Sequence, residues 1–182
     1  SGLANVSLDA QPLASGKSKF VGNVITNGNN IRSNFSNYWN QVTPENAGKW
    51  GSVQSGSGSY NWTQLDNIYN YAQSKGFKYR HHVLIWGQQQ PGFLGALDSA
   101  KQYFEIENWI KESGKRYPNA DYCEVVNEPL HAKPIYKNAL GGDGVTGWDW
   151  VIKAFELARK YWSPNTKLLI NEYSIINDNS AN

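Results

Sequence analysis

The sequence predicts an α/β fold: a (β/α)8 TIM barrel, of which the chain supplies about the first five strands and four helices. Strand-like apolar runs alternate regularly with segments of helical period, which implies parallel strands joined by right-handed crossovers. A doubly wound sheet would also fit 182 residues, and a whole barrel typically needs about 250. Two observations favour the barrel. Polar groups follow four consecutive strands, and no glycine-rich phosphate turn follows the first strand. Residues 1–182 are therefore expected to be the N-terminal portion of one barrel domain.

The five predicted strands share one design, in which apolar residues are followed by polar or aromatic groups. The first and weakest covers residues 20–24. The second, 38–42, leads into Thr43-Pro44-Glu45-Asn46, and the third, 79–86, leads into Gly87-Gln88-Gln89. The fourth lies in the run 123–129 and ends on Asn127-Glu128. The fifth, 167–170, leads into Asn171-Glu172-Tyr173.

Four segments between these strands have helical character. A short helix is expected over 30–37. The next begins at Thr63 as cap and stops at Lys75-Gly76, the third follows Asp98-Ser99, and the fourth runs over 148–162 before Ser163-Pro164. The spacing predicts three buried faces: Leu65, Ile68, Tyr69 and Ala72; Tyr103, Ile106 and Ile110; and Trp148, Val151, Ile152, Phe155, Ala158 and Trp162.

Composition narrows the class of partner. A net charge of +2 without charged blocks argues against nucleic acid and membrane surfaces, which usually require clustered Lys and Arg. The 8 Trp and 11 Tyr residues favour sugars, because flat rings stack on their apolar faces. The single cysteine, Cys123, excludes an internal disulfide and is interpreted as a small buried hydrophobe. No signal peptide is present at Ser1, although one could have been cleaved from a secreted protein, which is the location we expect.

Two sequence patterns that could indicate a cofactor or metal site, a glycine-rich stretch and the histidines, do not predict one here. The stretch 142–147 fits G-x-G-x-x-G, but it follows a long irregular loop (132–146) rather than a strand, so we interpret it as a flexible loop that can face substrate. The three histidines, His81, His82 and His131, lack ligand spacing with nearby acids or cysteine. No metal or organic cofactor is expected.

The carboxyl groups at the strand ends indicate glycoside hydrolysis, which needs two carboxyl groups flanking the scissile bond. Three glutamates qualify: Glu45, Glu128 and Glu172. Glu128 follows two valines and precedes a proline, an apolar setting that favours the protonated form a general acid needs. Asn127 could donate to the sugar 2-hydroxyl. Glu124 lies about four residues deeper on the same strand and is interpreted as structural.

The residues at the strand ends resemble, in order, the strand motifs of family 10 glycoside hydrolases, the endo-β-1,4-xylanases. The matching segments are Thr43-Pro44-Glu45-Asn46 with Lys49-Trp50, Arg80 to Trp86 with Gln89 and Pro91, Val125-Val126-Asn127-Glu128, and Asn171-Glu172-Tyr173. The resemblance implies a retaining endo-β-1,4-xylanase that hydrolyses internal linkages of xylan or xylo-oligosaccharide. It makes Glu128 the acid/base residue and Asn127 its 2-hydroxyl partner. It also makes six residues line the glycone subsites: Glu45, Asn46, Lys49, His82, Trp86 and Gln89.

The chain departs from the family pattern at four positions. Cys123-Glu124 stands where members usually carry Trp-Asp, Gly87 replaces a histidine, and Pro129 replaces an alanine, as in related barrel cellulases and mannanases. A cellulase or mannanase is therefore the nearest alternative function. A non-catalytic carbohydrate-binding protein is the alternative from another class.

The largest departure is that the Thr-Glu-Leu-Asp type motif, which carries the family's nucleophile after the seventh strand, does not occur before Asn182. Three explanations stay open: one piece of a split enzyme, a shortened polypeptide, or Glu172 as the second carboxylate, since neighbouring strand ends can hold a pair at about 5 Å. A five-stranded piece would leave open sheet edges. The expected partner is therefore a complementary C-terminal fragment of the same barrel.

Overall fold

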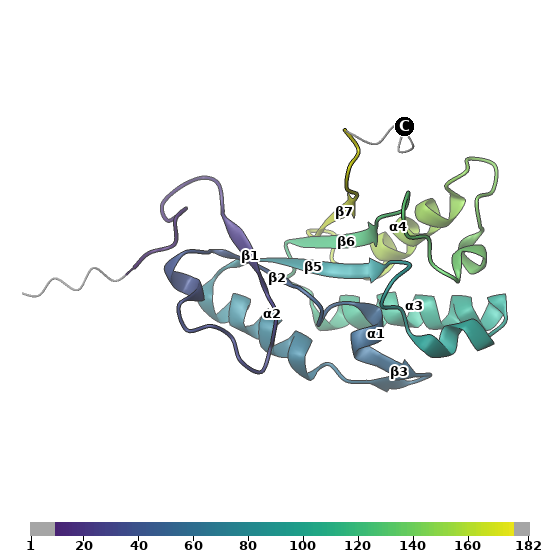
Figure 1. Ribbon diagram of the computed structural model, residues 1–182, viewed down its shortest axis with the longest axis horizontal. Coiled ribbons are helices and arrows are strands. Elements are labelled where there is room, and N and C mark those ends of the chain that lie inside the picture. The colour runs from purple at the N-terminus through teal and green to yellow at the C-terminus, as the bar shows by residue number, and fades with distance from the viewer. Residues whose placement is uncertain (1–9, 177–182) are drawn as a thin grey trace, which may run out of the picture.

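The computed structural model describes residues 10–176, and in this part of the chain one parallel sheet forms the centre of the fold (Figure 1). Its strands lie in the order β1-β2-β5-β6-β7, which is also their order along the chain. The bounds are β1 (Gly22–Ile25), β2 (Gln41–Pro44), β5 (Lys78–Ile85), β6 (Tyr122–Asn127) and β7 (Lys167–Asn171). This is the arrangement of the first five strands of a (β/α)8 barrel, so the predicted fold class is confirmed. The ends of the predicted domain, residues 1–9 and 177–182, lie outside the described residues.

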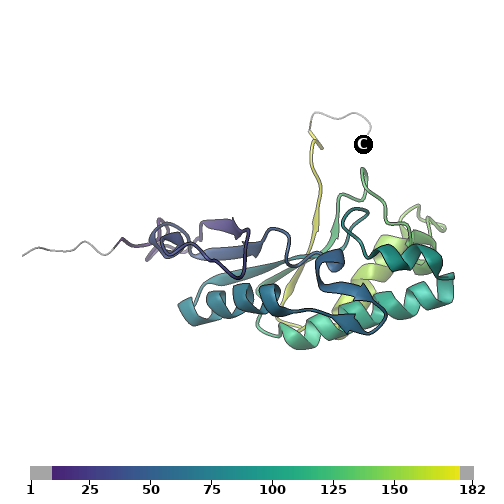
Figure 2. The same cartoon turned by 60° about the horizontal axis from the view of Figure 1, so that its bottom comes forward.

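The three long helices cover one face of this sheet (Figures 1 and 2). They are α2 (Thr63–Lys75), α3 (Ser99–Arg116) and α4 (Asp149–Tyr161). The shorter elements are α1 (Trp50–Val53), the two-stranded hairpin β3 (Gln54–Gly56) and β4 (Ser59–Tyr60), and the 3-10 turns η1 (Phe35–Asn37), η2 (Gly92–Ala96) and η3 (Lys137–Leu140). The opposite face of the sheet borders an open hollow of about 450 Å³, which corresponds to the barrel interior.

An aromatic stack joins the helices to the sheet. The Trp109 ring lies between those of Trp50 and Trp62, with both centroid separations 5.7 Å and the planes within 9° of parallel. Trp109 Nε1 also donates to the backbone carbonyl of Leu84 on β5 at 2.9 Å. Part of the aromatic content therefore fills the core rather than binding ligand. Cys123 is fully buried, as predicted.

The predicted helix over 30–37 is wrong, since only residues 35–37 form a single 3-10 turn. Just before this segment the backbone is held in a turn, because Asn27 Oδ1 accepts from the backbone N–H of Asn29 at 2.9 Å, and Asn34 gives no side-chain cap to η1. The predicted first two strands begin two and three residues too early. Thr63 is the first helical residue and not the cap; its N–H donates to Asn61 Oδ1 at 3.1 Å.

The predicted helix faces are right for α2 and α3 and partly wrong for α4; on α3, Ile106 and Ile110 are fully buried and Tyr103 packs partly buried against the core. All four residues named for α2 are buried, and Gly76 ends that helix with a left-handed φ of 67°. On α4 the buried side is formed by Trp150, Ala154, Leu157 and Ala158, whereas Ile152 is 48% exposed. Apolar residues surround most of α4, so its sequence allows two overlapping stripes. Packing against the sheet and α3 selects between them.

Candidate active site

Four strands end side by side and present one chemically distinctive residue each. Glu45 follows β2, Trp86 follows β5, Glu128 follows β6 and Glu172 follows β7. Because the strands are parallel and adjacent, these residues share the C-terminal edge of the sheet, as predicted. This edge is where barrels of this class carry their chemistry.

Glu128 is fixed by both neighbouring strands. Its backbone N–H donates to the carbonyl of Asn171 on β7 at 2.7 Å, and its φ of 53° lies in the left-handed region. On the other side, Trp86 Nε1 donates to Glu128 Oε2 at 2.9 Å. Sequence reasoning offered Trp86 only as a stacking face, so its role as a hydrogen-bond donor to Glu128 was missed.

Lys49 connects three of the predicted subsite residues. Its Nζ donates to Asn46 Oδ1 at 2.8 Å and to Gln89 Oε1 at 2.6 Å, and it lies 4.9 Å from the centroid of a Trp86 ring. Burial lowers the pKa of Lys49, an effect partly offset by the charges of Glu45 and Glu128. A lysine held this way offers an ordered donor to sugar hydroxyls.

His82 and Arg80 share a buried carboxylate. Glu124 Oε2 accepts from Arg80 Nη2 at 2.7 Å and lies 3.0 Å from His82 Nδ1, while the Glu124 side chain is 1% exposed. The structural interpretation of Glu124 agrees with this geometry. With Nδ1 engaged, His82 keeps Nε2 for another partner, and the ring borders the same hollow as Glu45 and Lys49. The His82–Val83 peptide bond is cis.

Both oxygens of Glu172 are occupied by the chain that follows Glu128. Oε2 accepts from the Leu130 N–H at 2.8 Å, and Oε1 accepts from the Tyr173 N–H at 2.9 Å and lies 2.7 Å from His131 Nδ1. Burial alone would raise the pKa of Glu172, but these hydrogen bonds together lower it. Such a carboxylate is suited to holding a loop and poorly placed to attack a sugar.

Asn127 is buried beside Glu128 and has one half of its amide committed. Its Oδ1 accepts from Asn171 Nδ2 at 2.9 Å, and Asn127 and Asn171 are partners in the β6–β7 register. The Nδ2 group of Asn127 is therefore the part of this amide that can donate to a ligand.

The backbone of the loop after Glu128 leaves no room for a side chain at Gly87, just after β5. Its N–H donates to the carbonyl of Ala132 at 3.0 Å, and a Cβ at Gly87 would lie 2.4 Å from that oxygen and 2.5 Å from the carbonyl oxygen of Lys133. The loop after Glu128 thus occupies the place where the family resemblance led us to expect a histidine. The sequence marked this departure but not its cause.

The G-x-G-x-x-G stretch is an irregular loop that leads into α4, as predicted from its context. Its three glycines, Gly142, Gly144 and Gly147, have positive φ, and the Asp149 carboxylate accepts from the N–H groups of Val145 and Thr146, each at 3.2 Å. Among residues 10–176, no cluster of His, Cys, Asp or Glu could hold a metal ion. Within the same residues, no helix is both long and apolar enough to cross a membrane.

Comparisons with known proteins agree with this geometry. Endo-1,4-beta-xylanase B of Cellvibrio japonicus is 42% identical over 158 residues, which cover 87% of this chain and 26% of that protein. Beta-1,4-xylanase of Dictyoglomus thermophilum is 31% identical over 141 residues, covering 76% of this chain and 40% of that protein. The chain therefore spans less than half the length of these relatives.

Two solved structures share the fold. The family 10 protein from Paenibacillus barcinonensis matches with a TM-score of 0.81 at 22% identity, over 96% of this chain and 56% of that chain. A mutant structure in complex with xylotriose matches with a TM-score of 0.77 at 22% identity, over 89% of this chain and 52% of that chain. The family model described as glycosyl hydrolase family 10 matches residues 10–182. Because this match agrees with the ordered strand-end motifs and with the five parallel strands, the chain belongs to glycosyl hydrolase family 10.

Proposed function

We propose that this chain is the acid/base-bearing part of a retaining endo-β-1,4-xylanase that hydrolyses internal linkages of xylan and xylo-oligosaccharides. The observation that carries the proposal is the placement of Glu128, whose carboxyl group is held at the C-terminal edge of the sheet by Trp86. Family membership and the names of the similar xylanases support xylan as the substrate.

In this proposal Glu128 acts twice. It first gives its proton to the oxygen of the leaving sugar, while a second carboxylate attacks the anomeric carbon and forms a glycosyl-enzyme intermediate. Glu128 then removes a proton from the water that hydrolyses the intermediate. Glu172 is not offered as the second carboxylate, because both its oxygens already accept hydrogen bonds. We place the nucleophile on a strand that completes the barrel.

The remaining residues of the edge are proposed to hold the sugars on the glycone side. The Nδ2 of Asn127 would donate to the 2-hydroxyl, a contact that strengthens in the transition state. Lys49 and its partners Asn46 and Gln89 would bind hydroxyls further along, together with Glu45. His82 would contribute through Nε2, because its Nδ1 faces Glu124.

We also propose a partner segment that supplies the remaining strands, in the same polypeptide or as a separate C-terminal fragment. Within residues 10–176, β1 and β7 are the two edge strands of the sheet, and their Val24 and Ile170 are 44% and 54% exposed. Unpaired edges with apolar side chains favour further strand pairing. A protein acting on a cell-wall polymer is also expected to be secreted.

The test uses the complete barrel, meaning this chain together with the strands that close it. A Glu128→Gln variant should lose about 10²–10⁴-fold in turnover of xylan, whereas Glu156→Gln, at an exposed pair on α4, should keep wild-type rates. NMR of the first product should show retained β configuration. Near-normal turnover by Glu128→Gln would refute the assignment. Faster hydrolysis of cellulose or mannan than of xylan would show that the protein is a cellulase or mannanase instead. Binding of xylo-oligosaccharide without hydrolysis would favour a non-catalytic carbohydrate-binding protein.

A further inference from the structure

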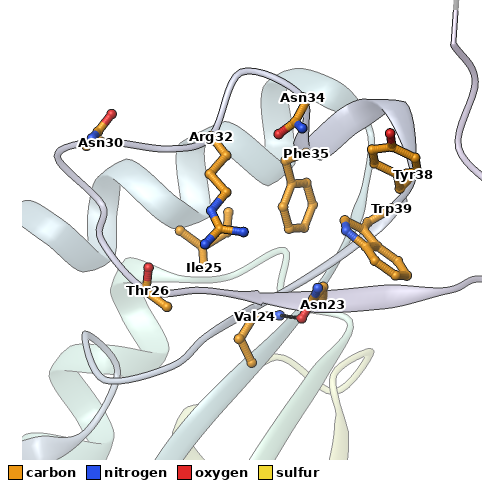
Figure 3. A pocket seen from close by; sticks show the side chains of 10 residues that line it. All are labelled: Asn23, Val24, Ile25, Thr26, Asn30, Arg32, Asn34, Phe35, Tyr38 and Trp39. Carbon is orange, nitrogen blue, oxygen red and sulfur yellow. Dashed lines mark hydrogen bonds between the residues drawn. The ribbon is translucent and has the colours of Figure 1, made fainter.

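A cavity beside β1 and a buried carboxylate on α3 both lie outside the proposed site. The cavity has a volume of about 280 Å³ and is lined in part by Asn23 and Val24 of an edge strand, so the proposed partner segment would alter it (Figure 3). The carboxylate belongs to Glu105 on α3, the helix that follows β5. Both neighbours of β5 in the sheet, β2 and β6, are present, so the surroundings of Glu105 stay the same when the barrel is completed.

The Glu105 carboxylate is buried without a cation beside it. It is 4% exposed, and it forms no ion pair with any residue in the range 10–176. Its oxygens instead accept hydrogen bonds from the β3–β4 hairpin: Oε2 from Gln54 Nε2 at 3.0 Å, and Oε1 from the hydroxyl of Ser57. A buried carboxylate costs free energy unless such bonds satisfy it. Because hydrogen bonds to a charged acceptor are stronger than neutral ones, Glu105 holds Gln54 firmly.

The Gln54 amide can take only one orientation. A carboxylate only accepts, so Nε2 must face Glu105, and Nε2 also donates to the Gly56 carbonyl at 3.1 Å. An indole only donates, so Oε1 must face Trp50, whose Nε1 lies 2.6 Å away. Gln54 is 1% exposed, and turning its amide would place donor against donor at Trp50 and acceptor against acceptor at Glu105. Glu105 therefore fixes the Trp50 ring through Gln54.

Trp50 links this network to the glycone side of the site. It is the first residue of α1, it is 3% exposed, and its ring stacks on that of Trp109. Lys49 precedes it, and Gly51 follows it with an N–H that donates to the carbonyl of Gln89 at 2.8 Å. A Cβ at Gly51 would lie 2.4 Å from that oxygen, so α1 abuts the chain that carries Gln89. A shift of Trp50 would therefore move Lys49 relative to Gln89, its hydrogen-bond partner.

We propose that Gln54 and Glu105 are positioning residues, which hold Trp50 in place so that the neighbouring Lys49 is directed at the hydroxyls of the glycone sugars. They act through Trp50 and do not touch the substrate. The inference rests on the proposed function only in taking a xylo-oligosaccharide as the ligand. It predicts a loss of affinity rather than of the chemical step, because Lys49 binds hydroxyls and does not react.

The experiment measures the affinity for xylohexaose by calorimetry, in the complete barrel carrying Glu128→Gln so that the probe is not hydrolysed. Gln54→Met replaces the amide with a thioether of similar length, which neither donates to Glu105 nor fixes Trp50. We expect about tenfold weaker binding, as for the loss of one hydrogen bond from a charged group. In a Lys49→Met background the same substitution should cause less than about a twofold further loss, because its effect passes through Lys49.

Three variants separate positioning from a loss of stability. Glu105→Gln can still accept from Gln54 and should bind within about twofold of its parent, whereas Glu105→Met frees the Gln54 amide to turn and should bind about threefold to tenfold more weakly. Glu105→Met also carries the test if Gln54→Met does not fold. Thr166→Val removes a buried hydrogen bond to the Ala120 carbonyl at the opposite end of the sheet. It should lower the urea midpoint, as Gln54→Met does, but leave the affinity unchanged.

Several outcomes would overturn the inference. Unchanged affinity in both Gln54→Met and Glu105→Met would show that the network does not direct Lys49. An equally large loss in the Lys49→Met background would show that Gln54 acts by another route. A fall in affinity that follows stability in every variant, Thr166→Val included, would leave the network a purely structural role. Hydrolysis of xylan by the barrel with Glu128 intact tests the proposed function separately, and its failure would leave these binding results standing.

Discussion

One substitution can remove the hydrogen bond between Trp86 and Glu128 while keeping an aromatic ring at position 86. In a Trp86→Phe variant, the Nε1 that donates to Glu128 Oε2 at 2.9 Å is lost, but an aromatic ring remains beneath Lys49. A hydrogen bond to a charged group contributes about 1.5–3 kcal/mol, and both partners here are half-buried, which favours the lower end. A loss of about 1.5 kcal/mol corresponds to a roughly tenfold lower kcat/KM on xylan.

The matched control for this experiment is Trp148→Phe. The Trp148 ring also has a lysine over it, with Lys133 Nζ 5.3 Å from the centroid, but its Nε1 makes no hydrogen bond to any residue in the range 10–176. Initial rates of the complete barrel on xylan should therefore fall tenfold for Trp86→Phe and less than twofold for Trp148→Phe. Equal rates for the two variants would refute the claim that Trp86 acts through this hydrogen bond.

Three further predictions concern the frame around the site, and each is checked by urea unfolding. Glu124→Gln should lower the free energy of unfolding by about 2–3 kcal/mol. This is less than for a fully buried pair, because its partners Arg80 and His82 are 34% and 18% exposed. The control Glu156→Gln, at an exposed position, should change the free energy of unfolding by under about 0.5 kcal/mol. Gly87→Ala places a Cβ 2.4 Å from a backbone oxygen and should cost about 1–3 kcal/mol, whereas Gly92→Ala, with no atom within 4 Å, should stay within about 1 kcal/mol. Burial lowers the pKa of His81 to about 3, so the unfolded state binds the proton first and stability should fall as the pH drops from about 6.5 toward 3, by up to about 1.4 kcal/mol per pH unit. A His81→Gln variant with an equally steep dependence would contradict that reasoning.

The sequence predicted the strands well because their signal is local. A run of apolar residues ending on a polar group is visible without knowing what lies beside it, and all five predicted strands overlap observed ones. The short α1 and the β3–β4 hairpin were missed, since elements of two to four residues have no measurable period. The region 30–37 failed for another reason: Asn34 gives no side-chain cap to η1, and just before the segment Asn27 bonds to nearby backbone, which competes with helix formation.

The candidate site could be predicted as a set of residues but not as a network. Glu128, Trp86 and Lys49 each lie at a predicted strand end or just after one. Their contacts join residues about 40 positions apart, as in the bonds between Trp86 and Glu128 and between Lys49 and Gln89. Which donor meets which acceptor depends on strand order and register, and neither is encoded in a single motif. The pairing of Arg80 with Glu124 was missed for the same reason.

The backbone conformation of Glu128 also depends on which strand lies beside β6. A left-handed φ is unfavourable for a residue with a side chain, by about 1 kcal/mol or more, and such a residue keeps it only where its surroundings fix it. Here the surroundings are the carbonyl of Asn171 on β7, which accepts the Glu128 N–H, and Glu172, which holds the N–H of Leu130. The direction of the proposed proton donor is therefore set by the strand after its own. A role for Glu172 in supporting Glu128 follows from this geometry.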